Sequence, residues 1–172
     1  MKNIKLIIIL TSLVFANLPL TTSASVVDEN QLKLVGEGKM SFLFWDVYLL
    51  RLYTANGEYK TRQHPLALEF NYLMDIEAKE LVEETVNQWR EQDMPEHKDE
   101  QDWVEQLNNL WPDIQDGDQL LFIVDENKHS QFYYNQNYRG VIQSSEFSER
   151  FSAIWLSEKT TAPKVRKKLL GD

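Results

Sequence analysis

The three histidines are the first residues to consider for chemistry, because a neutral imidazole can bind a metal or move a proton near neutral pH. His64, His97 and His129 are scattered among predicted turns and helix starts, with no pair at i, i+4 spacing. A zinc site needs clustered ligands, often with cysteine, and the chain has no cysteine. We therefore expect surface histidines and no metal site.

A second group, Asp125, His129 and Ser130, holds the residue types of a hydrolytic triad. No nucleophile elbow surrounds the serine, and the polar residues of a hairpin tip explain all three without catalysis. The segment Gly36-Glu37-Gly38 lacks the third glycine and the following helix of a dinucleotide-binding loop. These motifs predict neither hydrolysis nor a nucleotide cofactor, and we expect no cofactor.

The composition excludes further classes of protein. The 172 residues include 18 Lys and Arg against 27 Asp and Glu, for a net charge of −9, and 42% of the chain is hydrophobic. Nucleic acid is disfavoured as a partner because a phosphate backbone is bound by clustered cations. Without cysteine, disulfides and thiol nucleophiles are excluded. An acidic chain of one globular domain remains.

Residues 1–24 indicate a secretory signal peptide. Lys2 and Lys5 accompany an apolar stretch over residues 4–16, and small residues follow up to Ala24. At about 1.5 Å per helical residue the stretch covers about 20 Å, which is short of a hydrocarbon core of about 30 Å. We expect cleavage near Ala24, no stable membrane span afterwards, and a mature domain over residues 25–172 with a net charge of −11 in the bacterial periplasm.

The periodicity of apolar residues predicts which elements must position any site. The expected strands are a hairpin with a turn or bulge at Gly36–Gly38, a half-buried strand and a second hairpin, over residues 32–53, 66–72, 119–125 and 130–136. From Phe42 onward both faces of the first hairpin are apolar, which suits a strand covered on both sides.

The expected helices run over residues 75–92, 103–111, 144–156 and 163–171, with Asp75 and the serines at 144 and 145 as caps. Strands are thus grouped with strands and helices with helices. This order predicts an α+β fold, an antiparallel sheet with a layer of helices on one face.

Five segments form a wider pattern in chain order: GEGKMSFLFWDVYLLRLY, FNYLMDI, VNQWREQD, DGDQLLFIV and FSERFSAIWLSEKTTAPKVRKKLLG. Together they span about Leu32 to Gly171 and resemble the chalcone isomerase family, in its bacterial exported branch. The resemblance implies a chalcone isomerase-like domain over residues 25–172, built as an open-faced β-sandwich with a ligand cleft between sheet and helices. Family members include enzymes that close a chalcone into a flavanone, fatty-acid-binding proteins and proteins without known activity.

The catalytic residues of the plant enzymes find no match. The resemblance places their arginine, threonine, tyrosine and asparagine at about Gln31, Leu43, Pro95 and Asp102. Ring closure needs cationic and hydroxyl groups that stabilise an enolate, and Leu43 and Pro95 supply neither. We therefore name no catalytic residue and expect a non-enzymatic protein. An isomerase or lyase with a rebuilt site is an alternative.

The resemblance and the many aromatic residues together suggest a cleft that binds a small apolar or amphipathic ligand such as a fatty acid. The candidate lining consists of six aromatic residues, with two arginines for a ligand carboxylate: Phe42, Phe44, Tyr48, Tyr72, Trp89 and Trp103, with Arg51 and Arg90. The competing interpretation is that most of these rings fill the core.

Acidic residues gather in one part of the chain. Residues 75–118 hold 15 acidic and 3 basic residues. The simple interpretation is a solvated face of the two middle helices. The alternative is a protein-interaction module, in which an acidic helical face including Glu83, Glu84 and Glu91 docks an unknown basic partner in the cell envelope.

Overall fold

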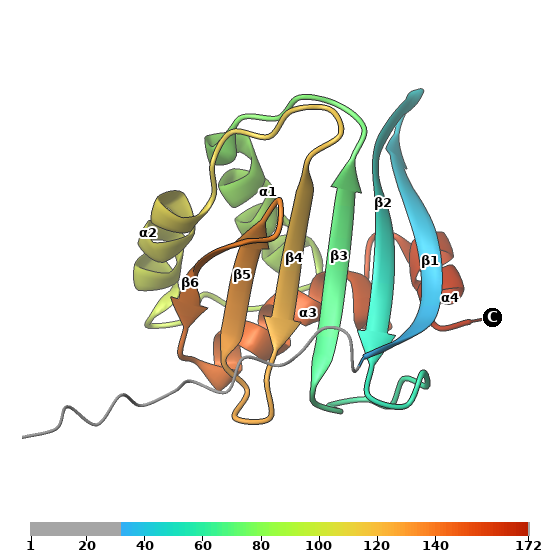
Figure 1. Ribbon diagram of the computed structural model, residues 1–172. Coiled ribbons are helices and arrows are strands. Elements are labelled where there is room, and N and C mark those ends of the chain that lie inside the picture. Colours follow the sequence, from blue (N-terminus) through green and yellow to red (C-terminus); the bar gives the residue numbers. More distant parts are fainter. Residues whose placement is uncertain (1–31, 172) are drawn as a thin grey trace, which may run out of the picture.

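The computed structural model describes residues 32–171, and the predicted signal peptide lies outside the described residues. Within them, six strands form one antiparallel sheet in which every strand pairs with its sequence neighbours (Figure 1). The strands are β1 (Lys33–Phe42), β2 (Trp45–Thr54), β3 (Leu66–Tyr72), β4 (Gln119–Val124), β5 (Ser130–Tyr134) and β6 (Asn137–Ile142). The helices are α1 (Ala78–Glu91), α2 (Glu100–Leu110), α3 (Ser145–Leu156) and α4 (Pro163–Leu169).

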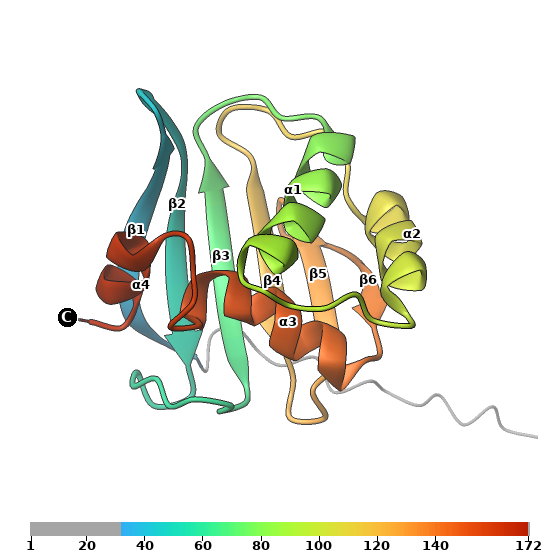
Figure 2. The same ribbon diagram turned by 180° about the vertical axis from the view of Figure 1, so that it is seen from behind.

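All four helices lie on one face of the sheet, as the two opposite views show (Figures 1 and 2). Helix α4 packs against β1 at one edge, and α1, α2 and α3 cover the rest. This confirms the predicted α+β fold with a helical layer on one face. None of the helices between residues 32 and 171 has the length and apolar character needed to cross a bilayer.

The half-buried strand was predicted correctly, and it shows how the sheet is divided. On β3, Leu66, Leu68, Phe70 and Tyr72 are buried in the core that the helices cover. Glu69 alternates with them, and its carboxylate accepts hydrogen bonds on the other face. Because successive strand residues point to opposite faces, the period of two decides which side chains can reach the helices.

The structure differs from the sequence predictions at one strand and at the start of one helix. Strand β6 was not predicted, because its first three residues are exposed and it contains Gly140, so it lacks an apolar alternation. Helix α1 begins at Ala78, not at Asp75, because the Asp75 carboxylate accepts a hydrogen bond from the Asp116 backbone at 2.8 Å. The predicted cap at Ser144 is confirmed, since its hydroxyl accepts from the Phe147 N–H at 3.2 Å.

The first hairpin also differs from its prediction. Its turn lies at Leu43–Phe44, so a turn at Gly36–Gly38 is wrong. The nearby register shift lies just before this segment, between Leu34 and Gly36, and residues 36–38 themselves pair in register with β2. The expectation of a strand covered on both sides is wrong as well, because the helices cover one face only. The glycines instead let α4 approach β1. A Cβ on Gly36 would meet the carbonyl oxygens of Lys168 and Leu169, the latter at 2.7 Å.

We therefore expect Gly36→Ala to push α4 away from β1 and to lower the free energy of unfolding by about 1–3 kcal/mol, as overpacking does. Gly38→Ala is the matched variant, because its Cβ would come no closer than 3.1 Å to Val165, and it should cost less. Urea denaturation followed by circular dichroism measures both. Equal stability of Gly36→Ala and the unaltered protein would contradict this account of the packing.

Candidate functional site

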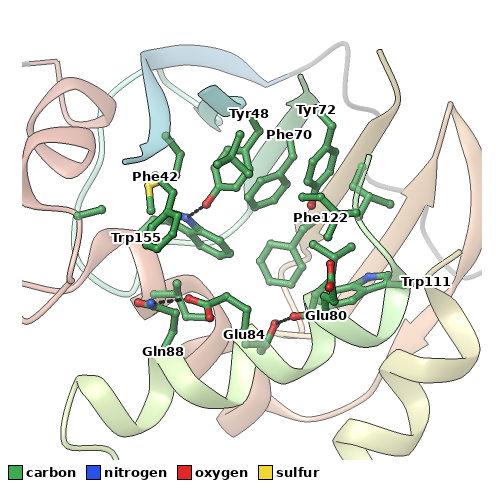
Figure 3. Close-up of a pocket in the computed structure, with 18 of the residues that line it drawn as sticks. Phe42, Tyr48, Phe70, Tyr72, Glu80, Glu84, Gln88, Trp111, Phe122 and Trp155 are labelled. Carbon is green, nitrogen blue, oxygen red and sulfur yellow. Dashed lines mark hydrogen bonds between the residues drawn. The ribbon is translucent and has the colours of Figure 1, made fainter. Parts of the chain in front are cut away.

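A cavity of about 380 Å³ lies between the helix-facing side of the sheet and helices α1 and α3 (Figure 3). Aromatic residues of β2, β3 and β4 form its sheet wall, namely Tyr48, Phe70, Tyr72 and Phe122. Tyr48 stands edge-on to both Phe70 and Tyr72, with ring centroids 5.4 and 5.6 Å apart. The alternation that buries one face of the sheet therefore also supplies an apolar wall.

Trp155 of α3 joins the helical layer to this wall. Its ring stands 4.9 Å from Phe70, centroid to centroid, and its indole Nε1 donates a hydrogen bond to the Tyr48 hydroxyl at 3.0 Å. Burial raises the pKa of Tyr48 to about 12, against the hydrogen bond from Trp155, which lowers it. Tyr48 thus stays neutral near pH 7. Because its oxygen accepts from Trp155, its own proton remains able to donate.

Tyr72 supplies a second neutral hydroxyl to the cavity. The residue is only 5% exposed, and burial raises its pKa well above the ordinary value of 10.0. Among the described residues, none forms a hydrogen bond with this hydroxyl. The indole nitrogen of Trp111, which also lines the cavity, is buried without a hydrogen-bond partner within residues 32–171. The walls thus combine apolar surface with neutral donor groups.

Helix α1 provides the polar side of the cavity. Glu80, Glu84, Thr85 and Gln88 line it, and both glutamates are exposed, which places them at the rim. The Gln88 amide donates to Glu84 at 2.8 Å and accepts from the Thr161 hydroxyl at 2.6 Å. Among the described lining residues there is no lysine, arginine or histidine. The electrostatic character of the rim is therefore negative.

Three of the eight predicted ligand-contacting residues, Phe42, Tyr48 and Tyr72, line this cavity. Trp89 and Trp103 do not line it, since they are 0% and 2% exposed and pack against each other in the core with ring centroids 6.1 Å apart. They match the competing interpretation that the rings fill the core.

The other three predicted residues lie elsewhere. Phe44 is 97% exposed in the turn between β1 and β2. The Arg51 guanidinium contacts Glu37 at 2.5 Å and Glu69 at 3.0 Å on the face away from the helices. Arg90 pairs with Glu100 where α1 meets α2. Neither arginine lines the cavity, so neither is placed to meet a carboxylate bound inside it.

Sequence reasoning missed Phe70, Phe122 and Trp155 as parts of this site. Phe70 could have been found, because it shares the period-two face of β3 with Tyr72. Trp155 lies on the apolar face of α3, yet an apolar helical face does not distinguish a core position from a cavity wall. No sequence signal distinguishes Phe122 from its neighbours in the apolar run of β4.

The residues with triad chemistry have structural roles in the β4–β5 turn. One Asp125 carboxylate oxygen accepts from the Asn127 and His129 backbone N–H groups, both at 2.9 Å. The Ser130 hydroxyl lies 2.8 Å from that of Ser148. Within residues 32–171, no group of three histidine, aspartate or glutamate side chains is arranged to hold a metal ion.

Comparisons with known proteins agree with this architecture. A family model described as chalcone isomerase-like matches residues 14–171. An uncharacterized protein of Haemophilus influenzae is 25% identical over 137 residues, which are 80% of this chain and 67% of that protein. The crystal structure of a fatty-acid binding protein from Arabidopsis thaliana matches with a TM-score of 0.65 at 13% identity, over 86% of this chain and 89% of that one. At that identity the match concerns the fold alone.

Proposed function

Because this chain belongs to the chalcone isomerase-like family, we propose that it binds a small apolar or amphipathic molecule between its sheet and α1. The observation that carries the proposal is the cavity itself. Its volume of about 380 Å³ falls in the ordinary range of ligand sites, and aromatic side chains with a few hydroxyl groups form its walls. The Arabidopsis thaliana protein of the same fold is named as a fatty-acid binding protein, which supports a ligand with an apolar chain.

The charges around the cavity bear on the polar end of that ligand. A carboxylate near Glu80 or Glu84 would be repelled, and no described cation of the lining would compensate. Two like charges about 4 Å apart repel by about 1 kcal/mol in water and about 4 kcal/mol near a protein surface. One neutral hydrogen bond contributes about 1 kcal/mol and does not offset the repulsion expected near a protein surface. An uncharged oxygen that accepts from Tyr72 or Tyr48 therefore suits this site better than an ionised fatty acid.

Catalysis is the weaker proposal for the same cavity. Tyr48 and Tyr72 stay protonated near neutral pH because burial raises their pKa values, so they can donate protons but cannot act as bases. The acidic face of α1 is a separate alternative. Glu83, Glu84 and Glu91 are exposed on it, as a docking face for a basic partner would require.

We also propose export to the periplasm, on the strength of the basic start, the short apolar stretch and the small residues that end at Ala24. We expect protein recovered from the periplasm of a Gram-negative host to begin within one or two residues of Ser25. Amino-terminal sequencing and intact mass measure this. A protein that keeps Met1 and stays in the cytoplasm would refute the proposal.

Filling the cavity should abolish ligand binding. Ala162 lines it, so Ala162→Phe places a ring in the space. This variant should weaken the binding of decan-1-ol at least about tenfold, which is more than the loss of one buried CH2 group, about 0.8 kcal/mol, would cause. Titration followed by tryptophan fluorescence or by calorimetry gives the dissociation constants. The matched control is Ala55→Phe, at an exposed position that does not line the cavity.

Unchanged affinity in Ala162→Phe would place the ligand elsewhere. If the unaltered protein bound neither decan-1-ol nor any other decyl compound, the proposed function itself would fail.

The polar group of the ligand gives a second comparison at the same site. At pH 8, decanoate should bind at least about tenfold more weakly than decan-1-ol, because its carboxylate faces Glu80 and Glu84. Glu84→Gln should reduce this difference. Tyr72→Phe should weaken decan-1-ol binding about two- to tenfold, the value of one neutral hydrogen bond. Decanoate that binds as tightly as the alcohol would exclude the preference for an uncharged end while leaving the cavity as the binding site.

A further inference from the structure

The turn between β1 and β2 exposes four consecutive large apolar side chains. Phe42, Leu43, Phe44 and Trp45, here called the apolar tip, are 66%, 79%, 97% and 70% exposed. Leu73 and Met74, at the end of the neighbouring strand β3, are exposed as well. Contiguous apolar surface of this kind is uncommon on soluble proteins and marks sites of interaction.

Backbone geometry does not account for these residue types. Two-residue hairpin turns favour asparagine and glycine because their residues adopt positive φ. Here Leu43 takes a φ of 54° in the turn. A leucine thus occupies a position where a small or polar residue would fold more easily, and a second large apolar residue, Phe44, follows it. Their presence is better explained by what the tip contacts than by the turn itself.

The base of the apolar tip is braced, and its charges are paired. Lys39 and Asp46 form an ion pair at 2.6 Å, and the Ser41 hydroxyl donates to Asp46 at 2.7 Å. The lysine and the serine lower the pKa of Asp46, so the pair persists below neutral pH. The segment from Lys39 to Asp46 therefore carries no net charge, and its contact must be an apolar one.

The surroundings of the tip limit what it can contact. The β3–α1 and α2–β4 connections lie at the same end of the sheet (Figure 1), and with the start of α1 they carry Asp75, Glu80, Asp113 and Asp116. A symmetric contact between two copies through the tip would bring two such acidic ends together. An anionic membrane would be repelled in the same way. A lipid surface without net charge avoids both costs.

We propose that the apolar tip inserts into the interface of a zwitterionic lipid bilayer. Tryptophan and phenylalanine are side chains that the boundary between headgroups and acyl chains accepts, and tryptophan is enriched there. The tip and the cavity are continuous, because Phe42, Trp45 and Met74 belong to the exposed surface and also line the cavity. A bilayer in contact with the tip would thus lie at the mouth of the cavity, where an apolar ligand could pass between them. Only this passage of a ligand rests on the proposed function.

The five tryptophans make a site-specific test available. Trp45 is 70% exposed, whereas Trp89, Trp103, Trp111 and Trp155 are each at most 8% exposed. Vesicles of phosphatidylcholine with brominated acyl chains should quench the Trp45 emission of the purified chain and shift it to shorter wavelength. Trp45→Phe should abolish both effects. The double variant Leu43→Ser, Phe44→Ser should weaken vesicle binding by more than about tenfold, because two large apolar side chains no longer enter the lipid.

The matched control is Leu34→Ser, which removes a 50% exposed leucine near the other end of β1 and should leave the quenching unchanged. Absence of quenching in the unaltered protein would overturn the proposal, as would quenching that the double variant retains. Stronger binding to anionic vesicles would contradict the charge argument. A dimer in sedimentation velocity that the double variant abolishes, without quenching, would assign the tip to self-association. Binding of decan-1-ol by the double variant reports separately on the cavity.

Discussion

The structure depends on burying one face of the sheet under the helical layer. Leu52, Leu68 and Phe122 lie side by side across β2, β3 and β4 and are at most 1% exposed. Each such side chain contributes about 1.5–3 kcal/mol when it is fully buried, so this layer is a main source of stability. Farther along the same strands, Tyr48, Phe70 and Tyr72 continue this face. Together with Phe122 they line a cavity that the helices do not fill.

The same constraint decides which residues cannot take part in the site. Arg51 is three residues from Tyr48 on β2, an odd separation, so the strand turns it to the opposite face. There it pairs with Glu37 and Glu69, and Asn71 donates to Glu69 at 2.7 Å. The open face thus satisfies its own charges. The cavity consequently has walls of neutral aromatic residues with acidic groups at the rim. Arg51 is absent from these walls because alternate residues of β2 point to opposite faces of the sheet.

The alternation of side chains along a strand also shows how much of the fold and of the site could be predicted from the sequence. The alternation on β3 and the serine cap of α3 were evident from residue types, and so was the grouping of strands and helices. The position of Arg51 relative to Tyr48 could have been derived from the same alternation. The turn at Leu43–Phe44 could not, because no residue there signals a turn and the only nearby glycines serve the approach of α4. Strand β6 likewise has no apolar period of its own.

The cavity could not be predicted, because it depends on the spacing between packed elements. Helical periodicity puts Trp89 and Trp155 on inward faces, yet one is fully enclosed and the other forms a wall. The Trp155 bond to Tyr48 joins α3 to β2 and satisfies the indole of Trp155, while the indole nitrogen of Trp111, another residue of the cavity wall, stays buried without a partner among the described residues. A buried, unpaired donor group costs about 1–3 kcal/mol, which is a substantial part of a typical folding free energy of about 5–15 kcal/mol. A ligand with an accepting oxygen would remove that cost. The unpaired donor that lowers the stability of the ligand-free protein would therefore raise its affinity for such a ligand.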